Sequence, residues 1–284
     1  MRSQKIIFFL SIILTLIAFW NFQAMTYLKA VIVLFHEICH ASAALLTGGV
    51  VERIFIHGNE TGETVISGKM QASFLFVVSA GYIGSSLLGG VLLNRGFDKK
   101  HAKQFLGFVG IFLILFTHFY SANHDFTYNT GIRFGIIFVI LSFISREISS
   151  LTLIFLGTGV SLYSIYDLVD FTNHIHHTDA GILASWILGK KERLFGLNLK
   201  ELGILIAVIW SSISLFILGT LVKKTFTEPD RFARMSKLKR QFAEAKVEPD
   251  VAQWFLSRGL DLNGKPLDKD WATQLKKEGM KEHE

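Results

Sequence analysis

With 284 residues, of which 50% are hydrophobic and 18% are charged, the chain is too apolar for a soluble protein of this length. The composition therefore excludes a soluble globular enzyme and predicts an all-α polytopic membrane protein. The net charge of +6 does not indicate nucleic acid binding, because the basic residues lie in loops and in the C-terminal region, where they orient spans and contact anionic lipid.

Uncharged apolar stretches predict about seven transmembrane helices. The first stretch could also be a cleaved signal peptide, but Phe22 stands where a small residue is needed before the cleavage site, so we expect a retained span. The expected spans are Ile6 to Trp20, Ala30 to Leu46, Met70 to Asn94, Gln104 to Tyr120, Phe134 to Ser145 with an extension back past Arg133, Glu147 to Asp167 and Leu202 to Val222. Residues 1–222 would then form the transmembrane domain.

The C-terminal part of the chain has a different composition. Residues 223–284 are rich in charge and contain all three prolines, and they predict a small soluble helical tail. Before the last span, the stretch from Ala180 to Gly189 is apolar but too short to cross a bilayer, so we expect it to lie in the interface.

The second expected span carries the motif His36-Glu37-Ile38-Cys39-His40. In a helix, His36 and His40 project from one face a turn apart, so both imidazoles could bind one tetrahedral zinc ion. Glu37 lies beside them, where it could act as general base toward a zinc-activated water. Ionisable groups inside a span are costly, so the cluster needs a partner such as a divalent cation. The alternative is a buried cluster satisfied by hydrogen bonds to neighbouring helices.

A short β-hairpin is expected directly after this span, over about residues 50–68. Val50 to Ile56 and Thr64 to Ser67 are apolar or β-branched runs on either side of a turn segment, residues 57–62. Next to a buried active site, a hairpin edge could pair with an extended substrate through main-chain hydrogen bonds. A purely structural flap is an equally good interpretation.

A catalytic zinc ion that two histidines hold needs a third protein ligand and one open position. Asp167 is the candidate that lies deepest in the expected sixth span, and Asp170 follows about one turn later on the same face. Because the span ends in this region, Asp167 could instead be a helix-end carboxylate in water.

In its motifs, the chain resembles the site-2 proteases, which are intramembrane zinc metallopeptidases, and within them a bacterial, plant and fungal branch described as site-2-protease-like. The resemblance covers about Val31 to Ser185 and rests on five segments in a fixed order. These are HEICHASAALLTGG over residues 36–49, Gly-Glu-Thr-Val over 62–65, Ala-Gly-Tyr-Ile-Gly-Ser-Ser over 80–86, Ile-Tyr-Asp-Leu-Val-Asp over 165–170 and Thr-Asp-Ala over 178–180.

The resemblance implies a zinc site with Glu37 as the catalytic base and residues 1–222 as a transmembrane metallopeptidase domain. The implied zinc ligands are two motif histidines and one aspartate of a later span, which by motif looks like Asp167: His36, His40 and Asp167. The chain lacks the Asn-Pro-Asp-Gly and Leu-Asp-Gly signatures of better-known members, so Asp170 and Asp179 remain alternatives for the third ligand.

We therefore expect a multi-pass zinc metallopeptidase of the bacterial cell membrane that hydrolyses peptide bonds of membrane-associated or transmembrane protein substrates. The rival hypothesis is a zinc-binding membrane protein that hydrolyses nothing, either a metal-handling permease or a degenerate protease used as a scaffold. A transporter would carry ionisable residues inside several spans, whereas here they concentrate at one site. Transport also requires no base between the histidines, which favours the enzyme.

Overall fold

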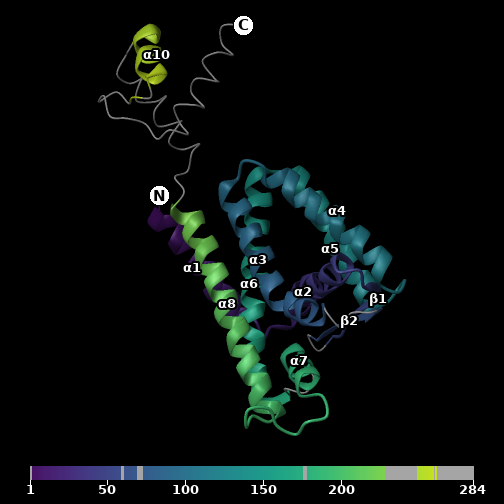
Figure 1. The fold of residues 1–284 in the computed structure, drawn as a ribbon. Coiled ribbons are helices and arrows are strands. Elements are labelled where there is room, and N and C mark those ends of the chain that lie inside the picture. Colours follow the sequence, from purple (N-terminus) through teal and green to yellow (C-terminus); the bar gives the residue numbers. More distant parts are fainter. Residues whose placement is uncertain are drawn as a thin grey trace. The chain divides into compact units, whose positions relative to one another are not determined.

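The computed structural model describes residues 2–58, 61–68, 73–174, 178–227, 248–258 and 260, without the side chains of residues 2–5, 24, 164–174, 227, 249, 252, 253 and 256. Internal contacts divide the chain into two units, residues 1–227 and 228–284. The described part of the first unit is mostly helical and contains one two-stranded antiparallel sheet (Figure 1).

The helices and strands of the first unit follow one another with short connections. They are α1 (Arg2–Phe19), the 3-10 helix η1 (Gln23–Met25), α2 (Thr26–Leu46), β1 (Val50–Ile56), β2 (Gly62–Ser67), α3 (Phe74–Asp98), α4 (Ala102–Tyr120), α5 (Phe126–Ile144), α6 (Arg146–His174), α7 (Asp179–Leu188) and α8 (Leu199–Thr227). In the second unit, the described residues contain α10 (Pro249–Ser257).

Five of the described helices are long and apolar enough to cross a membrane, as an integral membrane protein requires: α2, α3, α4, α5 and α8 over Leu199–Phe226. The expected spans in α1 and α6 are not among them, and the described apolar part of α1, Ile6–Phe19, is shorter. The expected number of seven spans is therefore not confirmed, whereas the helical class and the small hairpin are.

The chain leaves α2 through a Schellman motif, which sets the start of the hairpin. Gly48 has a φ of 82°, in the left-handed region that glycine adopts without steric cost. The Gly49 N–H donates to the carbonyl of Ala44 at 2.9 Å, and the Gly48 N–H donates to that of Leu45 at 3.3 Å. The reversal is complete within three residues, so β1 begins beside the helix that carries the histidine motif.

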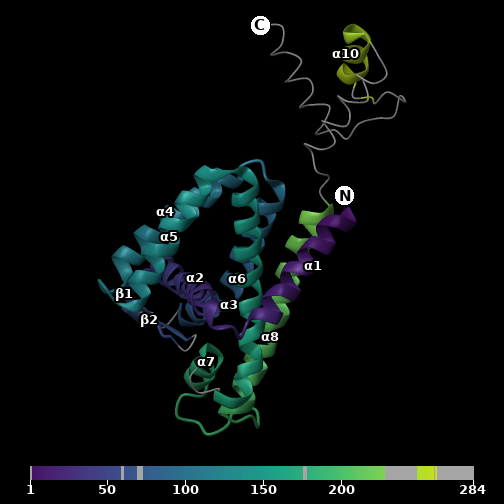
Figure 2. The ribbon, with the colours of Figure 1, turned by 180° about the vertical axis from the view of Figure 1, so that it is seen from behind.

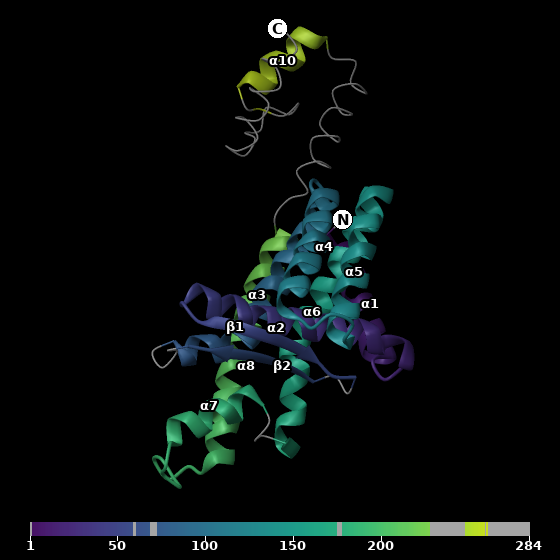
Figure 3. The same cartoon turned by 90° about the vertical axis from the view of Figure 1, so that its right-hand side faces the viewer.

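α2 is the central helix of the first unit. Its side chains from Ala30 to Phe35 are all buried, and it packs against α3, α6 and both strands, which lie alongside it (Figure 3). Next to it, α3 and α6 approach closely at glycines, since a Cβ on Gly89 would overlap the backbone of Gly157 and Ser161. The histidine motif thus lies in a helix that is held from several sides.

The remaining helices of the first unit surround this centre. α4 and α5 form an antiparallel pair, and α1 lies beside α8, as Figures 1 and 2 both show. The carboxylate of Asp125 caps α5 by accepting from the Tyr128 N–H at 2.6 Å. The short apolar helix α7 packs against α8 and α3. Its length of 10 residues agrees with the expectation that this stretch is too short to cross a bilayer.

The hairpin has the position that the sequence predicts. β1 and β2 pair antiparallel from Val50 opposite Ser67 to Ile56 opposite Gly62, with a register irregularity between Val51 and Arg53. At the end of β1, the Ile56 N–H donates to the hydroxyl of Thr127 in α5 at 2.8 Å. This bond fastens the last residue of β1 to the helix pair α4–α5.

The expected tail lies mostly outside the described residues. Of residues 223–284, the structure describes the end of α8, which reaches Thr227, and the short stretch that contains α10. A boundary at residue 222 and a soluble charged tail therefore stay predictions.

Candidate metal centre

The motif from His36 to His40 spans just over one turn in the buried part of α2. His36 and His40 are 4% and 6% exposed, and their Nε2 atoms lie 3.2 Å apart. The apolar residues on both sides of the motif favour a continuous helix, and the helix places the two rings on one face, as expected from their spacing. The two imidazoles therefore present one nitrogen each to a common point.

A carboxylate from a distant part of the chain reaches the same point. Asp179 Oδ2 lies 3.2 Å from His36 Nε2 and 3.0 Å from His40 Nε2. Asp179 is the first residue of α7, and the hydroxyl of Thr178 caps this helix by accepting from the Gly181 N–H at 3.2 Å. Among the described residues, His36, His40 and Asp179 form the group that could hold a metal ion.

Hydrogen bonds and ring contacts orient both imidazoles. The Nδ1 atom of His40 lies 2.8 Å from the carbonyl oxygen of Val77, which can only accept, so Nδ1 carries a hydrogen, and in the neutral ring Nε2 keeps the lone pair that a metal ion needs. The Nδ1 atom of His36 lies 3.4 Å from Ser85 Oγ. Edge contacts with Tyr82 and Tyr163 hold the His36 ring from two sides, at centroid distances of 5.1 and 5.3 Å.

The three ligand atoms fit a zinc ion. At bond lengths of about 2.0–2.1 Å, ligand atoms of a tetrahedral site are about 3.3 Å apart, and here the three separations are 3.0–3.2 Å. On α3, a Cβ at Gly81 would overlap the Nε2 atoms of both histidines. Glycine at this position therefore leaves free the space in front of the ring nitrogens.

The electrostatics of Asp179 also suit a metal ligand. Burial acts to raise the pKa of this carboxyl group, but the positive charge that the His40 and His36 rings carry when protonated, together with their hydrogen bonds, outweighs it, and the pKa lies below the ordinary range for an aspartate. The side chain is therefore an ionised carboxylate, the form that binds a divalent cation.

Glu37 is buried next to the histidines and contacts the hairpin. Its Oε2 atom accepts a hydrogen bond from the hydroxyl of Thr64 in β2 at 2.6 Å. Gly62 lies so close that a Cβ there would overlap the carboxylate of Glu37. Among the described residues, Glu37 is not part of the group that could hold a metal, so its carboxylate remains available as a base.

The candidates for the third ligand divide into two groups. Asp167 and Asp170 lie in α6, but their side chains are outside the described residues. Asp179, which was an alternative in the sequence, lies beside both histidines. Sequence reasoning assigned Thr64 and Gly81 no role at the metal centre, although both belong to segments on which the family resemblance rests.

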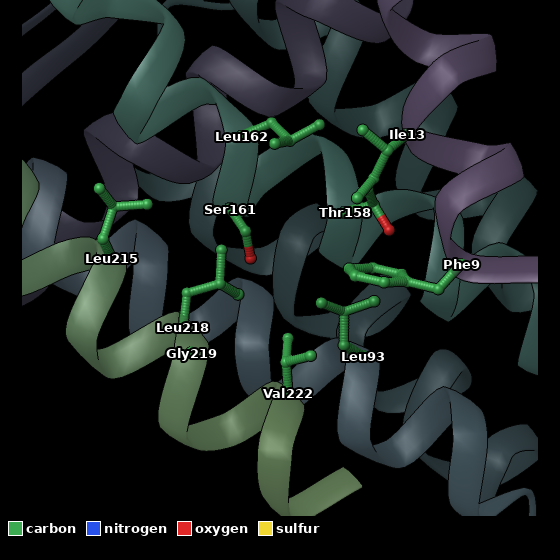
Figure 4. Close-up of a pocket in the computed structure, with 10 residues that line it drawn as sticks. All are labelled: Phe9, Ile13, Leu93, Thr158, Ser161, Leu162, Leu215, Leu218, Gly219 and Val222. Carbon is green, nitrogen blue, oxygen red and sulfur yellow. The ribbon is translucent and has the colours of Figure 1, made fainter. Parts of the chain in front are cut away.

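A separate cavity of about 240 Å³ lies between α1, α3, α6 and α8 (Figure 4). The residues that line it are Phe9, Ile13, Leu93, Thr158, Ser161, Leu162, Leu215, Leu218, Gly219 and Val222. None of these has a titratable side chain, so the cavity offers neither a metal ligand of the usual types nor a general base. It is distinct from the candidate metal centre.

Comparison with known proteins gives a family for most of the chain. The family model described as Peptidase M50B-like matches residues 9–221, a range that includes α2, the hairpin and Asp179. The comparison with curated proteins and the comparison with solved structures each returned no match.

Proposed function

The chain belongs to the Peptidase M50B-like family, a site-2 protease family of membrane peptidases, and on this basis we propose that it is a zinc metallopeptidase that cleaves membrane-associated or transmembrane protein substrates. The membership confirms the resemblance to site-2 proteases. The observation that carries the proposal is the meeting of two imidazoles of α2 with one carboxylate of α7, next to a buried glutamate.

In this proposal His36, His40 and Asp179 hold the ion. Bound zinc supplies a Lewis acid for the scissile carbonyl and lowers the pKa of a water molecule. Glu37 takes the proton from the attacking water and passes it to the leaving amine. The position of Glu37 next to the histidines supports this role, because a base must lie within hydrogen-bond reach of the proton that it accepts.

The hairpin is the proposed docking element for the substrate. One edge of β2 pairs with β1, and the far end of β1 is fastened to Thr127 of α5. The other edge of β2 pairs with no strand of the described residues. An extended substrate segment that adds to this edge gains main-chain hydrogen bonds and lies close to Glu37, because Thr64 of β2 contacts that carboxylate.

The number of spans also remains a proposal. Seven crossings follow if α1 and α6 span the bilayer in addition to the five helices that are long and apolar enough. Cysteine accessibility mapping in a Cys39→Ser background can test this, because Cys39 is the only cysteine of the chain.

The test of the function uses purified protein in detergent with a single-span membrane protein as probe substrate. We expect cleavage by the zinc-loaded protein, its loss with a chelator and its return with added zinc. Glu37→Gln should retain zinc and lose cleavage, because an amide cannot accept the proton. Glu52→Gln is the matched control, because Glu52 is exposed on β1. Full activity of Glu37→Gln would eliminate the mechanism.

The rival function, zinc binding without hydrolysis, makes a different forecast in the same experiment. Protein that holds zinc but cleaves no membrane substrate would favour a permease or a scaffold. Within the described residues, one group of side chains could hold a metal, and a path of further metal sites is not present among them. No observation on those residues favours the rival.

A further inference from the structure

We propose that Thr64 is a positioning residue for the catalytic base: its hydroxyl holds the Glu37 carboxylate in the working orientation and ties the base to the strand on which the substrate docks. This inference rests on the proposed function and adds to it a residue outside the His-Glu-Cys-His motif. It also gives the hairpin a role in the chemical step.

The contact between the two side chains is short and partly buried. Thr64 Oγ1 lies 2.6 Å from Glu37 Oε2 and 3.2 Å from the backbone carbonyl oxygen of the same residue. The hydroxyl has a single hydrogen, and the shorter separation favours its donation to Oε2. Glu37 is 5% exposed, so bulk water competes little for this bond.

The neighbouring glycine brings the strand into contact with the base. Gly62 and Thr64 are two residues apart in β2 and therefore point to the same face of the strand. A side chain at position 62 would overlap the Glu37 carboxylate, so only glycine allows the strand to approach this closely. Glu63, between them, points to the opposite face and is exposed. On the face of β2 that is turned to α2, Gly62 thus leaves space for the Glu37 carboxylate and Thr64 binds it.

The strand itself is held in register from the side of β1. Thr64 pairs with Ile54, whose side chain is 1% exposed in the core that surrounds α2. The Ile56 N–H bond to Thr127 fastens β1, the strand that pairs with β2, to α5. A threonine on a strand with these contacts has little freedom, so its hydroxyl restricts the rotamers of Glu37.

Substrate docking and base orientation are then mechanically linked. A segment that pairs with the open edge of β2 lies against the strand that carries Thr64, and Thr64 joins this strand to Glu37 through one hydrogen bond. Because this bond acts on the base and not on the substrate, its loss should lower kcat and leave KM almost unchanged. Misplacement of a catalytic group by about 1 Å can cost roughly 100-fold in rate.

The test compares Thr64→Val with Thr64→Ser in the full chain, purified with zinc. Valine keeps the shape and the strand preference but removes the hydroxyl, and serine keeps the hydroxyl. We expect Thr64→Val to retain zinc and to lose roughly 10- to 100-fold in kcat with little change in KM, and Thr64→Ser to return within about threefold of the original kcat. Thr152→Val is the matched control, because among the described residues its hydroxyl bonds only the Ile148 carbonyl of its own helix.

The possible outcomes separate this inference from the proposed function. A Thr64→Val protein with undiminished kcat, next to an active original chain, overturns the inference alone. So does a Thr64→Ser protein that is as impaired as Thr64→Val, because the hydroxyl would then not be the cause. An original chain that cleaves nothing overturns the proposed function and the inference together. If the valine variant does not fold, Thr64→Ala against Thr64→Ser provides the same contrast.

Discussion

Each motif side chain of the candidate centre has a contact that fixes it from outside the metal position. His40 Nδ1 donates to the carbonyl of Val77, and Glu37 accepts from Thr64. His36 is held between two tyrosine rings. These contacts leave free the Nε2 atoms of both histidines and the Oε1 atom of Glu37. The proposed chemistry needs these atoms, two to bind the ion and one to accept a proton. Little ordering is then required when an ion binds, which favours affinity.

The third ligand can be tested at the level of single side chains. Asp179→Asn replaces an anionic ligand by a neutral amide, so we expect the zinc affinity to fall by more than the roughly 10- to 100-fold that the loss of an outer-shell partner costs. Competition with a chromophoric chelator measures this affinity.

The other two candidate aspartates provide the matched comparison. Asp167→Asn and Asp170→Asn are expected to bind zinc as the original chain does, because Asp179 already supplies the carboxylate at the histidines. If Asp167→Asn lost zinc and Asp179→Asn retained it, Asp167 would be the third zinc ligand.

The residues of the site differ in how well a sequence can reveal them. His36, Glu37 and His40 are neighbours in the chain, so helical spacing alone places them on one face. Asp179 is separated from His36 by 143 residues, and its approach depends on where α7 begins. The Thr64 contact depends on strand register and on the close approach that Gly62 allows. Neither leaves a periodic signal in the sequence, which is why spacing did not single out these two residues.

The helices and strands whose ends are determined by neighbouring residues were predicted well from the sequence. The glycines after Leu46 ended α2, and β-branched residues on both sides of a turn formed the hairpin. The fifth span extends back past Arg133, as expected, but no start for it was predicted from the sequence; α5 starts at Phe126, where Asp125 provides a cap. A cap made by one side chain determines this start, and hydropathy does not detect it.

Close helix packing can be tested with a pair of glycine substitutions. Gly89→Ala places a methyl group against the backbone of Gly157 and Ser161, so we expect a lower unfolding temperature and a loss of roughly 1–3 kcal/mol of stability. Gly219 has open space around its Cβ position, at the cavity of Figure 4. Gly219→Ala should therefore be neutral or stabilising by up to about 1 kcal/mol.

Thermal unfolding of both purified variants in the same detergent measures this contrast. The two changes add the same methyl group to a helix of the first unit, so only the surroundings differ. Equal unfolding temperatures for the two variants would show that the α3–α6 contact is looser than the distances at Gly89 indicate.

At the scale of the whole molecule, the candidate centre joins elements from distant parts of the chain. α2 supplies the histidines and the base, β2 contacts the base, α3 leaves space through Gly81, and α7 supplies the carboxylate. An ion that bridges α2 and α7 therefore links segments that are otherwise connected through α3 and α8.

Zinc should for this reason stabilise the folded chain. A ligand that binds the folded state at 100 times its dissociation constant adds about 2.7 kcal/mol. We expect the unfolding temperature to rise when zinc replaces a chelator, as measured by differential scanning fluorimetry. His36→Ala removes one ligand and should show no such rise. An equal rise in His36→Ala would mean that the stabilising ion binds elsewhere.

The separation of the site residues along the chain has a consequence for biosynthesis. Glu37 and its partner Thr64 are 27 residues apart, and the reversal at Gly48 brings them together as soon as the hairpin exists. The histidines must wait until residue 179 has left the ribosome, because their carboxylate partner begins α7. A nascent or truncated chain thus has an oriented base but an incomplete set of ligands, and it remains inert until nearly two thirds of the polypeptide has been made.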